Sequence, residues 1–263
     1  MADFDPSIEG EIMDRATIIG LLVGVGGILL GNALEGGHIN SLLQGTAFVI
    51  VTAGTVGAVL VSNRTNDLKL GFKLFRETFK NQELDYEKPI SEIVECARIA
   101  KKESILALES KLNQLKSPML KDVMRNVVDG VDINLTRQIF ENIITEEEKK
   151  LLNAGKIWND AGGFSPTIGI IGAVLGLIHV MGNLTDTSKL GEGIAVAFVA
   201  TVYGVSFANL VYLPIANKIK KNIYELTTYK HMILDGALMV GTGLNAHLIE
   251  QKLISYTNQE EKI

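Results

Sequence analysis

The sequence predicts an all-α membrane protein with four transmembrane helices, a helical cytoplasmic domain inserted between the second and third of them, and a helical cytoplasmic C-terminal tail. The first observation is composition: 47% of the 263 residues are apolar and 26 are glycine, although 21% are charged. The second is segregation, because nearly uncharged apolar stretches alternate with stretches dense in Lys and Glu, as in membrane spans joined to soluble segments. The third is the helical periodicity of the charged stretches, in which no β alternation is found.

Four apolar segments come close to the ~20 residues that a helix needs to cross the hydrocarbon core. They form two close pairs, at residues 16–34 and 42–62 and at residues 166–182 and 194–214. The third segment is the shortest and needs Phe164 and Ser165 to reach the interface. Residues 1–14 are acidic and lack the basic start of a cleavable secretory signal, so we expect the first span to be retained.

Lys and Arg predict the orientation of the spans, because positive residues near helix ends are retained on the cytoplasmic side. The loops 35–41 and 183–193 carry one such residue between them, Lys189. The opposite ends carry many more, namely Arg15, Arg64, Lys69, Lys73, Lys149, Lys150, Lys156, Lys218, Lys220 and Lys221. We therefore expect a cytoplasmic N-terminus (1–15), two spans (16–63), a cytoplasmic helical domain (64–161), two further spans (162–217) and cytoplasmic C-terminal helices (218–263).

Glycines recur at short spacing within the first and third spans, namely Gly20, Gly24 and Gly27, and Gly169, Gly172 and Gly176. Small residues let helix backbones approach closely where lipid supplies no hydrophobic drive, so these faces are expected to pack on other helices. The alternative is the glycine that is generally common in membrane helices. Packing into an oligomer is favoured, with a subunit number that the pattern does not reveal.

The cytoplasmic segment shows helical periodicity in two places. One set is Ile90, Ile93, Val94, Ala97 and Ala100, and the other is Leu106, Leu112 and Leu115. Pro89 suits a first helical turn, and Ser117-Pro118 marks a break before another helix. The turn at residues 129–132 has a capping Asp, after which residues 135–150 resume as an amphipathic helix.

The tail at residues 222–256 is also amphipathic and is expected to continue or to pack against the fourth span. Gly236 and the stretch 241–243 are expected to interrupt it, and this stretch lacks the GxxxxGK pattern of a phosphate loop. The single cysteine, Cys96, has no disulfide partner and no metal-binding neighbours, so packing is its expected role.

Charge and motif content exclude several function classes. The net charge of −5 lacks the basic field that attracts nucleic acid. No GxSxG, HExxH or P-loop motif is present, and the four histidines are isolated from one another in sequence, so we expect no enzymatic activity and no metal or cofactor. None of the four apolar segments holds Asp or Glu in its interior, although proton and sodium pathways usually expose a carboxylate in the membrane. If the protein conducts ions, the carboxylate is expected to come from a partner.

A few residues in the third and fourth spans are candidates for coupling. His179 either relays protons or simply donates a hydrogen bond across helices. Thr201 either satisfies a backbone carbonyl or presents its hydroxyl to a passing ion. Pro166 and Pro214 lie at the cytoplasmic ends of their spans, where a missing amide bond creates a bend; they form either a moving joint or ordinary helix ends.

The sequence resembles the MotA/PomA flagellar stator subunits along nearly its whole length. The resemblance is carried by the third span (165–179) and, in order, by residues 16–20, 54–58, 107–109, 127–132, 193–198 and 201–204. It implies a pentamer in the bacterial inner membrane that surrounds a MotB-like dimer, whose transmembrane helix carries the ion-accepting aspartate. Ion flow then turns the ring against the rotor protein FliG, and Pro166 and Pro214 match the family's two coupling prolines.

Carried onto this chain, the resemblance assigns rotor-facing charges to Lys101, Lys102, Glu103 and Glu109, which would complement charges on the rotor. Without it, these residues read as a solvated helix face. The family often has Arg and Gly where this chain has Lys101 or Lys102 and Ser104, so the region is better defined than the contacts.

The coupling ion is expected to be the proton, with sodium as the alternative. Sodium-driven members of the family resemble this chain at Thr201 but tend to have Thr where Ala173 stands, and this hydroxyl is an oxygen ligand for a hard cation. Two other functions compete with the stator. One is an ExbB/TolQ-like energy-transducing subunit, which typically has three spans, and the other is a non-conducting membrane scaffold.

Overall fold

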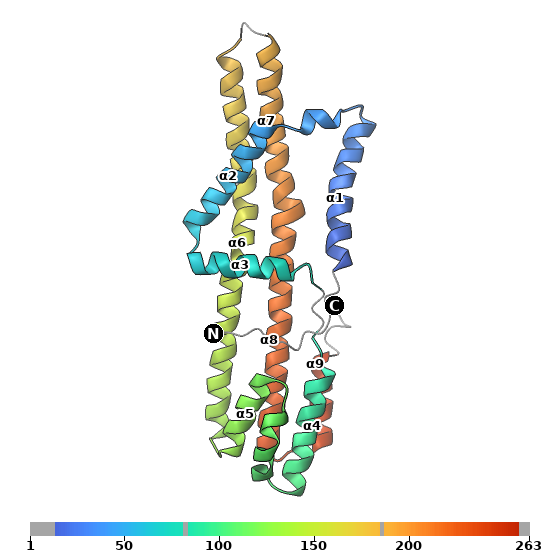
Figure 1. The fold of residues 1–263 in the computed structure, drawn as a ribbon, viewed down its shortest axis with the longest axis vertical. Coiled ribbons are helices and arrows are strands. Elements are labelled where there is room, and N and C mark those ends of the chain that lie inside the picture. Colours follow the sequence, from blue (N-terminus) through green and yellow to red (C-terminus); the bar gives the residue numbers. More distant parts are fainter. Residues whose placement is uncertain (1–13, 81–83, 185–186, 258–263) are drawn as a thin grey trace. The chain divides into compact units, whose positions relative to one another are not determined.

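The computed structural model describes residues 14–80, 84–184 and 187–257. Among these residues every regular element longer than one residue is a helix (Figure 1). The expected cytoplasmic N-terminus lies outside them, apart from its last two residues. The α-helices are α1 Arg15–Leu34, α2 Gly45–Ser62, α3 Thr65–Glu77, α4 Glu87–Lys102, α5 Pro118–Val128, α6 Ile133–Met181, α7 Thr187–Phe207, α8 Leu213–Gly241 and α9 Ala246–Thr257. Short 3-10 turns are η1 Ile39–Leu42, η2 Ile105–Ser110 and η3 Leu112–Gln114, and η4 Ala208–Tyr212 is a π-helical turn.

Two compact units divide the chain. The membrane unit comprises residues 12–81 and 151–221, and the core unit comprises residues 1–11, 82–150 and 222–263. Helices α6 and α8 contribute residues to both units. Four helical segments among the described residues are long and apolar enough to cross a membrane, as the sequence predicts.

The third and fourth spans are parts of longer helices than expected. Helix α6 runs unbroken for 49 residues, with Pro166 inside it, so the interpretation of Pro166 as an ordinary helix end is wrong. A proline inside a helix is tolerated in membrane proteins because neighbouring helices and local turn adjustments satisfy the freed backbone groups. Helix α7 begins at Thr187 rather than near residue 194, which brings Glu192 into its second turn.

The core unit is organised around large apolar side chains from α4, η2, η3, α5, α6, α8 and α9. Completely buried examples are Ile93, Leu120, Val123, Met124 and Met232. Cys96 is buried among them, in agreement with its expected packing role, and burial raises the pKa of its thiol to about 11. This is the arrangement expected where water drives large apolar side chains together.

One periodicity in the core unit is misleading. Leu106, Leu112 and Leu115 were expected on one helix, but this segment forms the separate 3-10 turns η2 and η3, and Leu106 is 68% exposed. The chain is extended at Ser104, directly after α4, so a new helix does not continue in phase. Leu108 is the fully buried anchor of this segment instead.

The ends of several helices agree with the sequence. The Ser117 hydroxyl accepts a hydrogen bond from the backbone N–H of Leu120 at 3.3 Å, and the Asp132 carboxylate accepts one from that of Leu135 at 2.9 Å. Gly243 has a φ of +73°, a left-handed backbone that glycine adopts without a steric penalty, and follows the end of α8. Gly236 was wrongly expected to interrupt the tail. It lies inside α8, where a Cβ would be 2.8 Å from the Ile93 side chain, so close packing explains this glycine.

Helix α3 of the membrane unit is amphipathic and lies across the direction of α6 (Figure 1). The Trp158 indole of α6 donates a hydrogen bond to the Gly71 carbonyl oxygen at 2.9 Å. Its ring stacks on Phe75 with centroids 4.6 Å apart and contacts Tyr212 in the π-turn at 6.3 Å. This aromatic cluster ties α3 to the region where α7 becomes α8, through contacts that favour a fixed ring geometry.

Candidate ion pathway and coupling site

A close seam of the membrane unit joins α6 to α7 through glycines. A Cβ at Gly169 would lie 2.8 Å from the Ala200 carbonyl oxygen, and one at Gly204 would lie 2.6 Å from the Ser165 carbonyl oxygen. Gly176 packs in the same way against the backbone of Gly193. The expectation that the third-span glycines pack on another helix is therefore confirmed. In the first span only Gly24 has a close neighbour within this chain, the Leu210 side chain, and Gly20 and Gly27 have none within 4 Å.

Ala173 and Thr201 lie on the same flank of this seam. Gly172 meets Ala200 across the seam, since a Cβ there would be 2.7 Å from the Ala200 Cβ. Successive residues turn by about 100° in an α-helix. Because α6 and α7 run antiparallel (Figure 1), the residues that follow Gly172 and Ala200 turn toward the same side. The structure thus brings together two of the residues that the sequence selected for the ion pathway, both half-buried.

The Thr201 hydroxyl donates a hydrogen bond to the Ala197 carbonyl oxygen of its own helix at 3.3 Å. This is the first of the two roles expected for it, and the oxygen retains lone pairs that can accept or coordinate. Ser165 makes the corresponding bond across the seam, because its buried hydroxyl donates to the Gly204 carbonyl oxygen at 3.0 Å. Ser165 is not among the functional residues predicted from the sequence, although a lone hydroxyl beside Pro166 was a usable signal.

Pro214 is the second residue of α8, which begins where the π-turn η4 ends. In this turn the Leu213 N–H bonds to the Ala208 carbonyl oxygen, five residues back. Proline has no N–H to offer the carbonyl four residues before it, and a widened turn accommodates this missing bond. The helix therefore continues as α8, so the interpretation of Pro214 as an ordinary helix end is also wrong. The widened turn was not predicted.

The two prolines lie near the same level of the membrane unit. A Cβ at Gly162 would be 2.5 Å from the Leu213 side chain, so α6 and α8 touch next to Pro214. Pro166 is one helical turn further along α6 from that contact. A bend at one proline would therefore act on the helix that carries the other.

Tyr203 belongs to the family-like stretch 201–204, but no role was predicted for it from the sequence. Its hydroxyl donates to the Leu42 carbonyl oxygen at 2.5 Å and accepts from the Gln44 N–H at 3.4 Å. These groups lie at the start of α2, so Tyr203 of α7 fixes where the second span begins. Its ring also contacts Phe48 at 6.3 Å.

His179 lies near the end of α6. Helix α6 ends at Met181, and the His179 carbonyl oxygen accepts a hydrogen bond from the Asn183 side chain beyond the helix end, at 2.9 Å. The imidazole is therefore on the last turn of the span and is exposed. Its two expected roles, a proton relay or a hydrogen bond across helices, stay predictions.

The first span is held by an ion pair at its start. Asp14 caps α1, and its carboxylate binds the Lys218 ammonium of α8 and accepts from the Thr17 hydroxyl at 2.5 Å. The hydrogen bonds from Lys218 and then Thr17 lower the pKa of Asp14 from 3.8 to about 2. Its backbone N–H also donates to the Phe79 carbonyl oxygen at 2.9 Å, which ties the start of α1 to the segment after α3.

The expected rotor-facing residues are all exposed and lie close together along the core unit. Lys101 and Lys102 form the last turn of α4, Glu103 follows them, and Glu109 is in η2, which packs back on α4. Within the described part of the chain none of these four side chains has an ion pair. They are therefore available to an outside partner.

The potential metal ligands of the described residues do not form a cluster. Among the described residues no group of three or more His, Cys, Asp or Glu side chains is arranged to hold a metal ion. Glu192 is near the beginning of α7 rather than in its middle. The apolar interior of the described spans thus offers hydroxyls and backbone carbonyls, without a carboxylate.

Comparisons with known proteins bear on the whole chain. The model of the MotA/TolQ/ExbB proton channel family matches residues 111–232, and that of the motility protein A N-terminal region matches residues 18–103. Motility protein A of Bacillus subtilis (strain 168) is 31% identical over 252 residues, which are 95% of this chain and 93% of that protein.

Two solved structures are similar to the fold described above. The flagellar MotAB stator complex from Bacillus subtilis matches with a TM-score of 0.85 and 31% identity, over 95% of this chain and 98% of that one. The structure of C. jejuni MotAB matches with a TM-score of 0.86 and 29% identity, over 93% and 96% of the two chains.

Proposed function

The chain belongs to the MotA/TolQ/ExbB proton channel family, and on that premise we propose that it is a flagellar motor stator subunit that conducts ions together with a MotB-like partner. The resemblance to the MotA/PomA subunits is thereby confirmed. The family is described as a channel rather than as an enzyme. The ExbB/TolQ alternative typically has three spans, and the four apolar helices described here favour the stator.

The observation that carries the proposal is helical continuity between the two units. Helix α6 joins the residues of the glycine seam to the core unit without a break, and α7 continues through the π-turn into α8. A change at the seam can therefore be transmitted along helices, with Pro166 and Pro214 as the places where they bend. This is the structural requirement for coupling ion passage to movement of a cytoplasmic domain.

The ion pathway is proposed to run between the Ala173 and Thr201 flank of the seam and the partner. The described spans hold no carboxylate in their interior, so the partner's transmembrane helix supplies the ion-accepting aspartate. Five copies of this chain would surround two partner helices in the bacterial inner membrane, with both termini in the cytoplasm. The exposed apolar faces of α1, α2 and α7 provide surface for neighbouring copies and lipid.

The core unit is proposed to push on the rotor protein FliG through Lys101, Lys102, Glu103 and Glu109. These four side chains are exposed, and none of them forms an ion pair with a described residue, which supports this role. Contacts between such exposed charges orient the two proteins and raise their association rate more than they raise the affinity, and salt weakens them. Torque transfer by repeated brief contacts needs fast association without tight binding.

Protons are proposed as the coupling ion, with sodium as the alternative. The Ala173 side chain offers no oxygen to a hard cation, which leaves the Thr201 hydroxyl as the one side-chain oxygen of this pair. A relayed proton needs one acceptor carboxylate, whereas a sodium ion needs several oxygen ligands at once.

Deletion of the gene tests the function. We expect cells that build filaments but do not rotate them, and restored swimming when the wild-type chain is supplied. Normal swimming of the deletion strain, in a cell without a second stator gene, would sink the proposal. For the ion, swimming speed should collapse with a protonophore and persist without sodium, and dependence on sodium would overturn the assignment of Ala173.

A further inference from the structure

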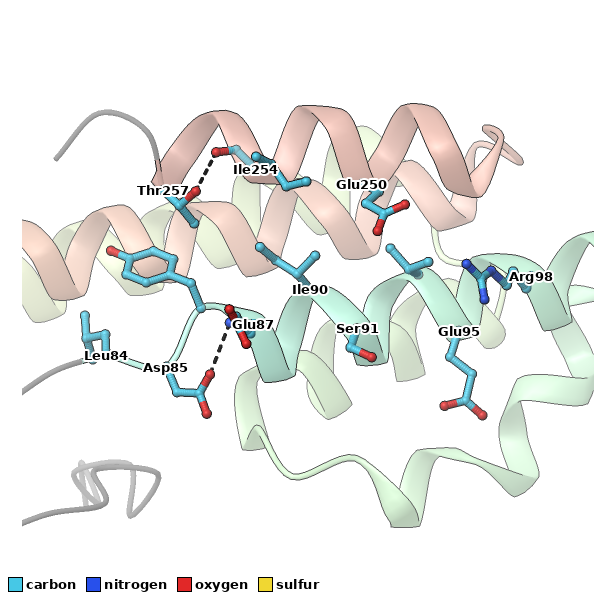
Figure 2. A pocket seen from close by; sticks show the side chains of 12 residues that line it. Leu84, Asp85, Glu87, Ile90, Ser91, Glu95, Arg98, Glu250, Ile254 and Thr257 are labelled. Carbon is cyan, nitrogen blue, oxygen red and sulfur yellow. Dashed lines mark hydrogen bonds between the residues drawn. The ribbon is translucent and has the colours of Figure 1, made fainter. Parts of the chain in front are cut away.

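A groove of about 850 Å³ lies between α4 and α9 of the core unit, and its lining on α4 ends at Arg98, about one helical turn before Lys101 (Figure 2). It follows the N-terminal part of α4, from Glu87 to Arg98, and the C-terminal part of α9, from Glu250 to Thr257. Lys101 to Glu109 come after this stretch and do not line it. We propose that this groove binds an amphipathic helix of a cytoplasmic partner protein, with basic side chains that face Glu87 and Glu250.

The groove has a small apolar floor between polar sides. Ile90 and Val94 of α4 line it at 8% and 5% exposure, so Ile254 of α9, which is 42% exposed, offers more apolar surface than either. Figure 2 shows Ile254 and Glu250 on α9 across from Ile90 on α4. A trough between two packed helices with such a floor has the form that binds one apolar face of a third helix, through anchors spaced three or four residues apart.

The rim of the groove carries four carboxylates, and two of them form no ion pair with a described residue. Asp85 accepts from the backbone N–H groups of Glu87 and Lys88 at 3.1 Å each and pairs with Lys88, and Glu95 pairs with Lys111. By contrast, Glu87, Glu250 and Arg98 have no ion pair with any residue that the structure describes. The unmatched charges are thus two acidic groups and, on the last groove-lining turn of α4, one basic group.

This charge pattern selects the occupant. The bound helix would place its apolar face over Ile90, Val94 and Ile254. Its Lys or Arg side chains would pair with Glu87 and Glu250, and one of its acidic side chains would pair with Arg98. A nucleic acid is excluded by the carboxylates. The chain's own segments at residues 1–13 and 258–263 each carry more Asp and Glu than Lys and Arg, so they lack the complementary charge.

Binding of a designed probe to the purified full-length chain in detergent tests the inference. The probe is a fluorescein-labelled synthetic helix with leucine on one face and lysine on the other, and the control probe has glutamate in place of lysine. Fluorescence anisotropy should show binding of the lysine probe that weakens with salt. Equal binding of the glutamate probe overturns the proposal.

Two matched pairs of variants locate the binding. Glu87→Gln with Glu250→Gln should raise the Kd for the lysine probe roughly tenfold, whereas Asp122→Asn with Glu146→Gln, an equal change of charge at exposed positions outside the groove, should leave it unchanged. Ile254→Asn should also weaken binding, whereas Leu248→Asn, at another exposed position of α9, should not. Equal effects of groove and control variants overturn the site.

Covalent labelling of an introduced cysteine, together with a competition experiment, distinguishes the helix from two other possible occupants, a polyamine and a second copy of the chain. Cys96 is buried with a raised pKa, so a cysteine placed by Ser91→Cys in the groove is the reactive thiol of the chain. A lysine probe with a bromoacetyl group should label it, as the thiolate displaces bromide, faster than it labels a Ser110→Cys control. Complete displacement of the probe by spermidine would indicate a small polyamine ligand, and a disulfide between two Ser91→Cys chains would indicate a subunit interface; either result overturns the proposal. Swimming is no part of these readouts, so they stand apart from the test of the stator function.

Discussion

In the core unit Ile93, Leu120 and Met124 are completely buried, whereas in the membrane unit large side chains such as Leu22 and Phe198 are 68% and 70% exposed. Close contacts between α6 and α7 of the membrane unit are made instead by glycines, whose backbones touch across these two helices. In water, burial of large apolar groups is the main stabilising term. In lipid that term is absent between helices, so close backbone approach takes its place. One chain thus uses two kinds of packing, and substitutions should act differently on each.

The largest expected effect is Gly204→Leu at the seam. The new side chain would collide with the Ser165 backbone and with Gly169, which are fixed in helix α6, so we expect a cost of about 3 kcal/mol or more and loss of the folded membrane unit. Recovery of monodisperse protein in detergent measures it. Gly191→Leu in the same helix is the control, because nothing lies within 4 Å of its Cβ position. Equal recovery of both variants would contradict the packing described.

Leu120→Ala probes the other kind of packing and should cost about 2–5 kcal/mol, because a buried side chain is replaced by a cavity. Cys96 lies in the same cluster and serves as the reporter. Maleimide labelling of this thiol should accelerate as the core unit opens more often. Leu106→Ala, at a 68% exposed leucine, should leave the labelling rate nearly unchanged. If both variants label alike, Leu120 is no core residue.

Asp14→Asn keeps a side chain that can cap α1 but removes the charge that pairs with Lys218, so it should cost about 1 kcal/mol through the lost ion pair. The folded-state pKa of Asp14 is about 2, below its ordinary 3.8. A depressed carboxyl pKa stabilises the folded state above pH 3.8, and this contribution is lost as the pH falls from there toward 2. Thermal unfolding from pH 6 to pH 3 should therefore show a smaller acid-induced decrease in the variant. An unchanged decrease would mean that Lys218 does not pair with Asp14 in solution.

The smallest effect on stability is expected for Lys102→Ala, within about 0.5 kcal/mol, because the side chain is exposed and has no ion pair among the described residues. The labelling rate of Cys96 should match that of the wild type. Swimming speed should nevertheless decrease if this residue contacts the rotor. Normal swimming with Lys101 and Lys102 both changed to Ala would remove these residues from the proposed rotor surface.

Local patterns predicted the fold well where one element decides the outcome. The caps at Ser117 and Asp132 depend on a side chain that reaches the backbone two or three residues on, so sequence spacing is sufficient. The prediction failed where a neighbour decides. Gly236 breaks no helix because Ile93 packs against it, and Leu106 turns outward because the chain leaves α4 in an extended conformation.

The candidate site shows the same division. Its four selected residues came from lone polar groups, prolines and the family resemblance, whereas Tyr203 and Ser165 acquire meaning only from carbonyl groups that lie across the helices. The sequence by itself determined the all-helical class, the four apolar spans and their lack of an interior carboxylate, because these depend on composition and length. Only the tertiary structure decided that α6 passes through Pro166, that α7 widens before Pro214, and that Ala173 and Thr201 share one flank. Those features depend on which backbone groups neighbouring helices satisfy, and that information is not local to any segment.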